Sequence, residues 1–321
     1  LFGIVGGGIA LFAMSQLHYR HLRRYAFYIF LLTVLLTLAV FIPGLGMTHG
    51  GATRWISIGG FTLQPAELLK LGFIIYVATW LSGMRDVITD TVKGTLPFVA
   101  IVGSVGFVML LQPDTDTFLI MGAAAMAMFV TAGGRWRDVG LMFVSAVLLL
   151  AIVAMVRPYI MDRLTTFLHP ERDPLGSGYQ IQQSLIAVGS GGFSGRGFGQ
   201  SIQKFEYLPE PIGDSIFAVY AEEFGFVGSS LLILLYLGFT FRGYKIAGQA
   251  PDLFGTLLVV GFMTLIICQA FLNIGAMLGV APLSGLPLPF ISHGGTALLA
   301  TLTMVGIVLN VSKYRETKRG A

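Results

Sequence analysis

Long apolar runs recur along this chain, and they leave little length for any other kind of structure. An α-helix needs about 17–25 apolar residues to cross about 30 Å of hydrocarbon, and the runs are of that length. About nine of them are present. They lie near residues 1–17, 25–42, 65–82, 95–111, 116–132, 139–156, 216–240, 253–273 and 295–311. The runs predict an all-α, polytopic helical membrane protein, with residues 1–321 forming a single integral membrane domain.

Charged residues make up 11% of the chain, whereas soluble domains carry about 25%. The net charge of +4 therefore gives no reason to expect a nucleic-acid partner, because basic residues in membrane proteins mostly mark short cytoplasmic loops. Cys268 is the only cysteine and lies inside an apolar run. The sequence thus offers no disulfide framework and no cysteine-based metal site.

The distribution of Lys and Arg predicts an orientation in the membrane. The connections on one side hold 13 of the 20 basic residues, and the short loops on the other side hold Arg54 alone. The long loop at about 157–215 also lies on the second side, but long loops translocate largely regardless of charge. We expect a cytoplasmic C-terminus, an external residue 1 and an external long loop. Residue 1 is a Leu within an apolar run, so we also expect a preceding span and a total of ten.

Glu67 and Lys70 open the third apolar run and are three residues apart, so they share one face of a helix and can pair. Two interpretations stay open. Glu67 would suit the N-terminal end of a helix, with the Lys70 side chain reaching toward the membrane surface. Alternatively both face a polar cavity, because a charge deep in a span costs about 2.5–3.5 kcal/mol.

A tight turn, Gln112-Pro-Asp-Thr-Asp-Thr, joins the fourth and fifth runs. Asp114 and Asp116 would suit the N-terminal cap of the following helix. As carboxylates on the external side they are also potential oxygen ligands of a divalent cation. No third ligand lies close to them in the sequence.

The long external loop is much longer than a simple connection between helices of a compact bundle, and loops of that kind usually have a function. Residues 157–169 predict a short amphipathic helix at the membrane interface that ends at Pro170. Residues 180–188 predict a second short helix.

The glycine-rich stretch at 189–199 follows this second helix. It lacks both the Lys-Ser/Thr of a P-loop and a preceding strand, so we expect no nucleotide site. Its backbone N–H groups, together with Arg196 and Lys204, are suited to binding a diphosphate. A plain surface loop is the alternative.

Asp214 lies where the long loop meets the seventh apolar run, and Gly213-Asp-Ser-Ile would also suit a helix N-cap. Glu222 follows about 2.2 helical turns later, close to the same face, whereas the adjacent Glu223 points elsewhere. A carboxylate that far into a span should face water, protein or substrate. We expect the chemistry at this junction of a polar loop with a membrane helix.

The last external loop, at 278–295, has no charged residue and three prolines between 282 and 289. Prolines and glycines at membrane depth indicate a re-entrant or cavity-lining segment. Ser292 and His293 are adjacent in it. A nucleophilic serine would need an acid to orient the histidine, and none is near in sequence.

Eight motifs are spread over the chain in a fixed order. They are Gly51-Ala-Thr-Arg-Trp-Ile, Leu63-Gln-Pro-Ala-Glu-Leu-Leu-Lys, Gln112-Pro-Asp, Gly178-Tyr-Gln, Gln183-Ser-Leu-Ile-Ala-Val-Gly-Ser-Gly-Gly, Tyr207-Leu-Pro-Glu, Asp214-Ser-Ile-Phe-Ala and Gly285-Leu-Pro-Leu-Pro-Phe-Ile-Ser-His-Gly-Gly. Together they resemble the SEDS family (shape, elongation, division and sporulation), the peptidoglycan polymerases typified by FtsW and RodA. Gly178-Tyr-Gln, Ser201 with Lys204, and Tyr207-Leu-Pro-Glu resemble the FtsW branch more than the RodA branch.

The resemblance implies a glycosyltransferase of the bacterial plasma membrane that acts on the external leaflet. Its donor would be lipid II, its acceptor the nascent glycan, and its leaving group undecaprenyl diphosphate. Asp214 matches the essential aspartate of the family and is the expected general base. The substrate-binding residues that we expect are Arg54, Glu67, Lys70, Gln112, Asp114, Arg196, Lys204, Glu210, Ser292 and His293.

The resemblance also implies a class B penicillin-binding protein as partner, together with proteins of the divisome or elongasome. It leaves a requirement for a divalent cation, Mg²⁺ or Mn²⁺, open. The sequence departs from the family pattern at Ile212-Gly213, at Asp116 and at His293. Two rival functions remain at this point: a lipid II flippase, and a non-catalytic scaffold for the penicillin-binding protein.

Overall fold

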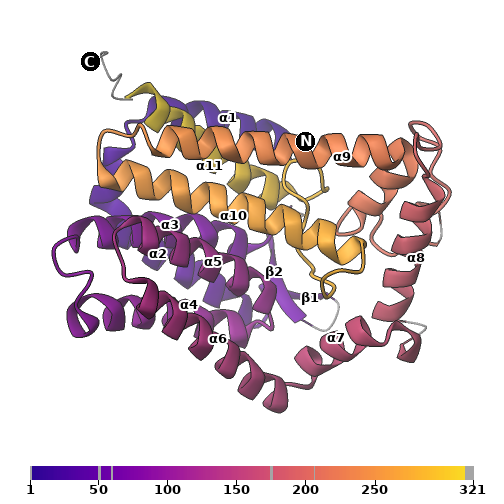
Figure 1. Ribbon diagram of the computed structural model, residues 1–321, viewed down its shortest axis with the longest axis horizontal. Helices are drawn as coiled ribbons and strands as arrows, with labels where there is room; N and C mark the ends of the chain where they lie inside the picture. Colours follow the sequence, from indigo (N-terminus) through magenta and orange to yellow (C-terminus); the bar gives the residue numbers. More distant parts are fainter. Residues whose placement is uncertain (1, 50–51, 59–60, 174–175, 206, 315–321) are drawn as a thin grey trace. The chain divides into compact units, whose positions relative to one another are not determined.

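The computed structural model describes residues 2–49, 52–58, 61–173, 176–205 and 207–314 (Figure 1). Its helices are α1 Phe2–Gln16, α2 Arg20–Leu38, α3 Pro65–Gly83, α4 Leu96–Leu111, α5 Thr115–Thr131, α6 Trp136–Val156, α7 Pro158–Leu168, α8 Ser177–Ser190, α9 Ile216–Ala247, α10 Leu253–Met277 and α11 Gly295–Lys313. Its strands are β1 Gly46–His49, β2 Ala52–Ile58 and β3 Phe61–Leu63. Gly51 and the basic tail from residue 315 onward, both used in the sequence analysis, lie outside the described residues.

The helices confirm the predicted membrane architecture. Seven helices in the described part of the chain are long and apolar enough to cross a membrane. Two shorter apolar helices, Gly3–Gln16 and Thr115–Thr131, fall on the two remaining predicted runs. The short helices α7 and α8 confirm those expected at 157–169 and 180–188.

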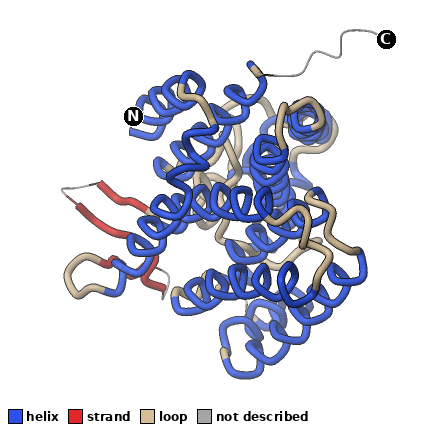
Figure 2. Tube along the Cα trace, turned by 90° about the vertical axis from the view of Figure 1, so that its left-hand side faces the viewer, coloured by secondary structure: helices blue, strands red, loops and turns tan. Residues whose placement is uncertain are grey.

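One element was missed. No strand was predicted in the segment after α2, but it forms an antiparallel sheet in the order β1-β2-β3. The sheet is held by pairings such as Met47 with Trp55 and Ser57 with Thr62. Figure 2 shows these strands in red among the blue helices. The β-branched and aromatic residues of Thr53-Arg-Trp-Ile favour a strand.

The chain divides into two compact units. Unit 1 comprises residues 1–140, 240–266 and 294–321, and unit 2 comprises residues 141–239 and 267–293. The expectation of a single membrane domain stays a prediction.

In unit 1, α1 packs along α11 and α2 packs along α3. Small residues allow the close approach: a Cβ on Gly306 would lie 2.6 Å from the carbonyl oxygen of Leu11. Asn310 of α11 is fully buried and ties the connection between α1 and α2. Its Nδ2 donates to the carbonyl of Ser15 at 2.8 Å, and its Oδ1 accepts from the Tyr19 amide at 2.9 Å.

In unit 2, helix α9 is broken at Gly225, where φ is 63° and ψ is −162°. The glycine-rich loop after α8 is hydrogen-bonded into the break and replaces the helical bonds that are lost there. The four backbone bonds are Arg196 N–H to Glu222 O, Gly197 N–H to Glu223 O, Phe226 N–H to Gly192 O and Val227 N–H to Phe193 O, at 2.9–3.2 Å. Irregular backbone at the edge of a membrane helix is tolerated because its polar groups are paired in this way.

Replacing Gly195 with Ala should destabilise the contact between the glycine-rich loop and the Gly225 break of α9. Gly195 has a φ of +80°, and a Cβ built there would lie 2.2 Å from the carbonyl oxygen of Glu223. The left-handed backbone alone costs a non-glycine residue about 1–3 kcal/mol. We expect a lower melting temperature of the purified protein. Gly189→Ala is the control because a Cβ on Gly189 meets nothing within 4 Å; equal melting temperatures for the two variants would contradict the prediction.

Candidate functional site

The turn that carries Asp214 precedes α9 in unit 2, and its backbone is held at three consecutive carbonyl groups. The three bonds are His293 N–H to Ile212 O at 2.8 Å, Ser292 Oγ to Gly213 O at 2.7 Å, and Asn273 Nδ2 to Asp214 O at 2.7 Å. The donors come from α10 and from the 278–293 segment. The position of the Asp214 backbone is therefore set by tertiary hydrogen bonds, and its side chain is half-buried.

The start of the turn is closed by Glu210 and Ser215. Glu210 has a left-handed φ of 48°, and its carbonyl accepts from the amides of Gly213 at 3.1 Å and Ser215 at 3.2 Å. The Ser215 hydroxyl donates to the carbonyl of Pro209 at 2.8 Å and accepts from Gln180 Nε2 of α8 at 2.9 Å. The Glu210 side chain is exposed, and its expected role in substrate binding stays a prediction. Because α9 begins at Ile216, Ser215 and not Asp214 directly precedes the helix.

Asn273 was missed in the sequence analysis. Its side chain is fully buried in α10, and the same Nδ2 group donates to the carbonyls of Asp214 at 2.7 Å and Leu286 at 2.8 Å. It therefore joins the Asp214 turn to the irregular 278–293 segment. The available signal was a strongly polar residue within an apolar run, which is itself a functional-site hypothesis.

Replacing Asn273 with Ala should reduce both stability and turnover. The two carbonyls lose their donor, and a buried unsatisfied group costs about 1–3 kcal/mol. Asn310→Ala in unit 1 is the matched control, because Asn310 is an equally buried asparagine that also donates to a backbone carbonyl. Both variants should melt at lower temperature, but only Asn273→Ala should lower kcat at a temperature where both remain folded. Equal kcat values would reduce Asn273 to a packing role.

Ser292 and His293, two of the expected site residues, both bind the backbone of the Asp214 turn. The Ser292 hydroxyl donates to Gly213 O and accepts from the Leu288 amide at 2.7 Å, so it is engaged by backbone groups on both sides. The His293 amide binds the turn, while its side chain is exposed. The serine braces the turn and is not poised as a nucleophile, and the imidazole remains the part of His293 that is accessible to a ligand.

Arg196 and Lys204, the two cations expected to bind a diphosphate, are placed against Glu222 and Glu223. Arg196 Nε lies 3.3 Å from Glu222 Oε1, and Lys204 Nζ lies 2.7 Å from Glu223 Oε1. The Arg196 side chain keeps an exposed fraction of 39%, against 23% for Lys204. Of the two, Arg196 is the better placed to reach a ligand.

Glu222 also binds residues 201–203, which follow the glycine-rich loop. Its carboxylate accepts from Ser201 Oγ at 2.6 Å and from the amides of Ile202 and Gln203, both at 3.2 Å. The sequence analysis expected Glu222 to face water, protein or substrate, and it faces protein. Glu222 and Glu223 thus fasten the glycine-rich loop to α9.

In unit 1, Glu67 and Lys70 form the predicted pair. Lys70 Nζ lies 2.8 Å from Glu67 Oε1 and 2.7 Å from Oε2, and both side chains are at most 2% exposed. The alternative in which Lys70 reaches the membrane surface is therefore wrong. A pair this deep in a helical bundle favours the interpretation of a polar interior.

Arg54, Gln112 and Asp114 also meet in unit 1. Arg54 of β2 donates from Nε to the carbonyl of Gln112 at 3.2 Å and also binds the carbonyl of Pro113. Asp114 is the N-cap of α5, and its carboxylate accepts from the Thr117 amide, which confirms the capping prediction for Asp114. Asp116 lies inside the first turn of the helix and is not the cap. Within the described residues, Asp114 Oδ2 and Gln112 Oε1 are buried acceptors without a donor. Such oxygens require water or a ligand hydroxyl.

The described residues do not fit a divalent-cation site built from protein alone. No group of three or more His, Cys, Asp or Glu side chains in them is arranged to hold a metal ion. Ions such as Mg²⁺ are commonly held by one or two carboxylates plus substrate phosphates. The requirement for a divalent cation therefore stays an open prediction.

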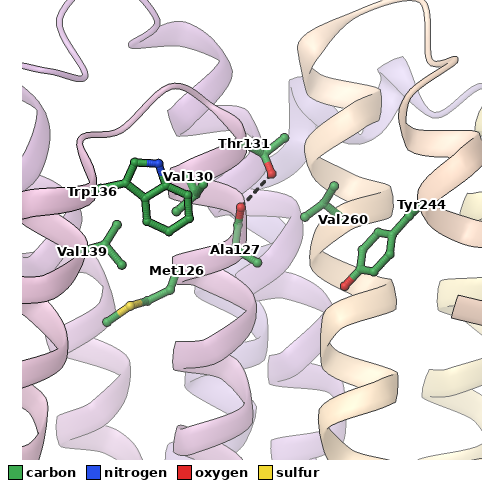
Figure 3. A pocket seen from close by; sticks show the side chains of 8 residues that line it. All are labelled: Met126, Ala127, Val130, Thr131, Trp136, Val139, Tyr244 and Val260. Atoms are coloured by element: carbon green, nitrogen blue, oxygen red, sulfur yellow. Dashed lines mark hydrogen bonds between the residues drawn. The ribbon is translucent and has the colours of Figure 1, made fainter. Parts of the chain in front are cut away.

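Two cavities lie in unit 1. One, of about 440 Å³, is lined mainly by apolar side chains, including Met126, Val130, Trp136 and Tyr244 (Figure 3). The other, of about 590 Å³, is more polar and is lined by residues that include Arg85 and Asp252. No predicted site residue lines either of them.

The chain is similar to one family of known proteins over nearly all of its length. The model of the FTSW_RODA_SPOVE family, described as cell cycle protein, matches residues 1–317. Stage V sporulation protein E of Bacillus subtilis is 41% identical over 96% of this chain and 84% of its own length. The probable peptidoglycan glycosyltransferase FtsW of Geobacter metallireducens is 39% identical over 97% and 83%.

Solved structures agree with this similarity. A chain from a study of the structural coordination of polymerization and crosslinking by a peptidoglycan synthase complex has a TM-score of 0.82 and 30% identity, covering 98% of this chain and 89% of that one. The rod shape determining protein RodA of Thermus thermophilus has a TM-score of 0.69 and 26% identity, covering 99% and 88%.

Proposed function

The chain belongs to the FtsW, RodA and SpoVE family of cell cycle proteins, and on that basis we propose that it is a peptidoglycan glycosyltransferase that polymerises lipid II into glycan strands. It is a multi-pass membrane protein. Two relatives carry the name of that enzyme class, FtsW, at 39–40% identity. In the proposed orientation the C-terminus is cytoplasmic and the Asp214 turn is external.

Asp214 is the general base in this proposal. Its carboxylate takes the proton of the acceptor sugar hydroxyl while that oxygen forms a bond to the anomeric carbon of the lipid-linked donor. The bond from the anomeric carbon to the diphosphate oxygen breaks, and undecaprenyl diphosphate leaves with the electron pair. A single displacement of this kind inverts the anomeric centre.

The observation that carries this assignment is the set of three hydrogen bonds to the carbonyls of residues 212, 213 and 214. We call this set the brace of the Asp214 turn. General acid–base catalysis requires a proton acceptor held within hydrogen-bond reach of the reacting hydroxyl. The brace fixes the Asp214 backbone through Asn273, Ser292 and His293 and leaves the side chain half-buried. The backbone that carries the carboxylate is therefore fixed before substrate binds, which lowers the entropy lost in the transition state.

The charge on the leaving diphosphate must be stabilised by cations. We propose Arg196 for this role, because its side chain remains partly exposed beside Glu222. Lys204 is a second candidate, although its side chain is less exposed. The substrate-binding roles expected for Arg54 and Lys70, which lie in unit 1, stay predictions. The exposed Glu210 and His293 side chains flank the Asp214 turn and are proposed to contact the sugars.

We also propose a class B penicillin-binding protein as partner, acting with the divisome or elongasome. Support comes from the structural similarity to a chain of a peptidoglycan synthase complex that couples polymerization and crosslinking.

The function is tested by supplying purified protein in liposomes with lipid II, with and without the class B partner. The product is read as a ladder of glycan strands on a gel. Polymer formed by this chain supports the proposal. Transfer of lipid II across the bilayer without polymer would assign the flippase function instead. If neither activity is detected, the scaffold function is the remaining hypothesis.

A further inference from the structure

The glycine-rich loop of unit 2 exposes large aromatic side chains. Phe193, Phe198 and Phe205 are 73%, 83% and 65% exposed, and Phe226, just past the break in α9, is 65% exposed. We call these four residues the aromatic patch. Isolated exposed apolar residues are ordinary, but several on one loop, on the residues that follow it and on the helix that it contacts indicate a surface that meets something other than water.

The patch is part of one ordered structure. The rings of Phe193 and Phe226 stack with centroids 6.1 Å apart, and Phe198 lies 6.1 Å from Phe224 of α9. Lys204 Nζ lies 5.2 Å from the centroid of the Phe205 ring. The four backbone bonds at the Gly225 break hold residues 192–197 against residues 222–227. The loop therefore keeps its aromatic side chains at the level of the break.

The sequence of α9 places the break at the edge of the hydrocarbon. Residues 224–241 contain no charged residue, and Arg242 follows them directly. The helix beyond the break, residues 226–241, rises about 24 Å, close to the thickness of the hydrocarbon core. Gly225 is thus at the end of the span that is remote from Arg242. Aromatic residues are enriched at that depth, where apolar side chains meet the headgroups.

The patch also continues the lipid-facing surface of α9. Beyond Phe226, the side chains of Val227, Leu231, Leu234 and Leu235 are 50–63% exposed, as expected for the outside of a membrane span. The stacked pair Phe193–Phe226 joins the loop to this surface.

We infer that the glycine-rich loop is seated in the lipid interface at the end of α9 that is remote from Arg242, with Phe193, Phe198, Phe205 and Phe226 in contact with lipid. The loop is a membrane anchor for the segment that leads to the Asp214 turn. This inference goes beyond the proposed function and does not depend on it.

The inference is tested with single spin labels on the reconstituted full chain. A Cys268→Ser background carries Phe198→Cys or Phe193→Cys, in liposomes of phosphatidylethanolamine and phosphatidylglycerol. Leu234→Cys, on the exposed face of α9, is the lipid reference, and Glu171→Cys, whose native side chain is 69% exposed on the long loop, is the water reference. The measurement is the ratio of collision rates with O₂, which concentrates in hydrocarbon, and with a water-soluble nickel chelate.

Labels at 198 and 193 should show a ratio shifted from that of Glu171→Cys toward that of Leu234→Cys. Ratios equal to the water reference at both positions would overturn the inference. Protection from both reagents would also overturn it, since that result means that protein, including a second copy of the chain, covers the patch. Because no turnover is measured, the result holds whether or not the protein polymerises lipid II.

Discussion

Replacing Asp214 with Asn should lower the rate of glycan polymerisation by about 10²–10⁴-fold, the usual contribution of a general base. Asparagine has nearly the shape of aspartate, and the bond from Asn273 goes to the backbone carbonyl of residue 214. The brace of the turn should therefore persist while proton acceptance is lost. The measurement is the initial rate of glycan formation from lipid II at saturating substrate, alongside the melting temperature of the variant.

Asp162→Asn is the matched control, because Asp162 is an exposed aspartate on α7 of the same unit. It should polymerise at the wild-type rate. If Asp214→Asn retains that rate with an unchanged melting temperature, Asp214 is not the base. If its melting temperature falls, the comparison is repeated at a temperature where both variants are folded.

The second large effect is expected at the buried pair of unit 1. Lys70→Met leaves the Glu67 carboxylate buried at the N-terminal end of α3 without the ammonium group 2.7 Å away. Breaking a buried ion pair from one side costs about 3–5 kcal/mol. We expect a large fall in the melting temperature and loss of polymer formation.

The double variant Glu67→Leu with Lys70→Met separates structure from substrate binding. Removing both charges together is often neutral for stability or even stabilising, so the double variant should melt well above Lys70→Met. If the pair binds substrate, polymerisation stays lost although stability returns. Recovery of both properties would show that the pair serves the fold alone, and a double variant no more stable than the single one would contradict the ion-pair argument.

Much of the fold was predictable because one physical constraint dominates it. Apolar length decides which segments cross a membrane, so the nine runs were located by counting residues. The cap at Asp114 and the pair Glu67–Lys70 followed from local spacing. The sheet β1–β3 was missed because short strands carry no length signal.

The candidate site was predictable only where a single residue type carries the chemistry. Asp214 was predicted from its position and from its resemblance to a family motif, and its catalytic role stays a prediction. Asn273 was missed because its role depends on a backbone carbonyl that is 59 residues away along the chain. The pairing of Arg196 with Glu222 was missed for the same reason, since no spacing rule connects a loop to a later helix break.

The four backbone hydrogen bonds between the glycine-rich loop and the Gly225 break limit how the two segments can move. The amides of Arg196, Gly197, Phe226 and Val227 are paired across two segments, so none of the four can exchange by fraying of a single helix end. Opening the loop and opening this part of α9 are one event, and cooperative units of this kind exchange together. Hydrogen exchange should therefore give these four amides a common rate. A ligand that slows one of them should slow all four, which would carry a signal from the glycine-rich loop into the membrane helix.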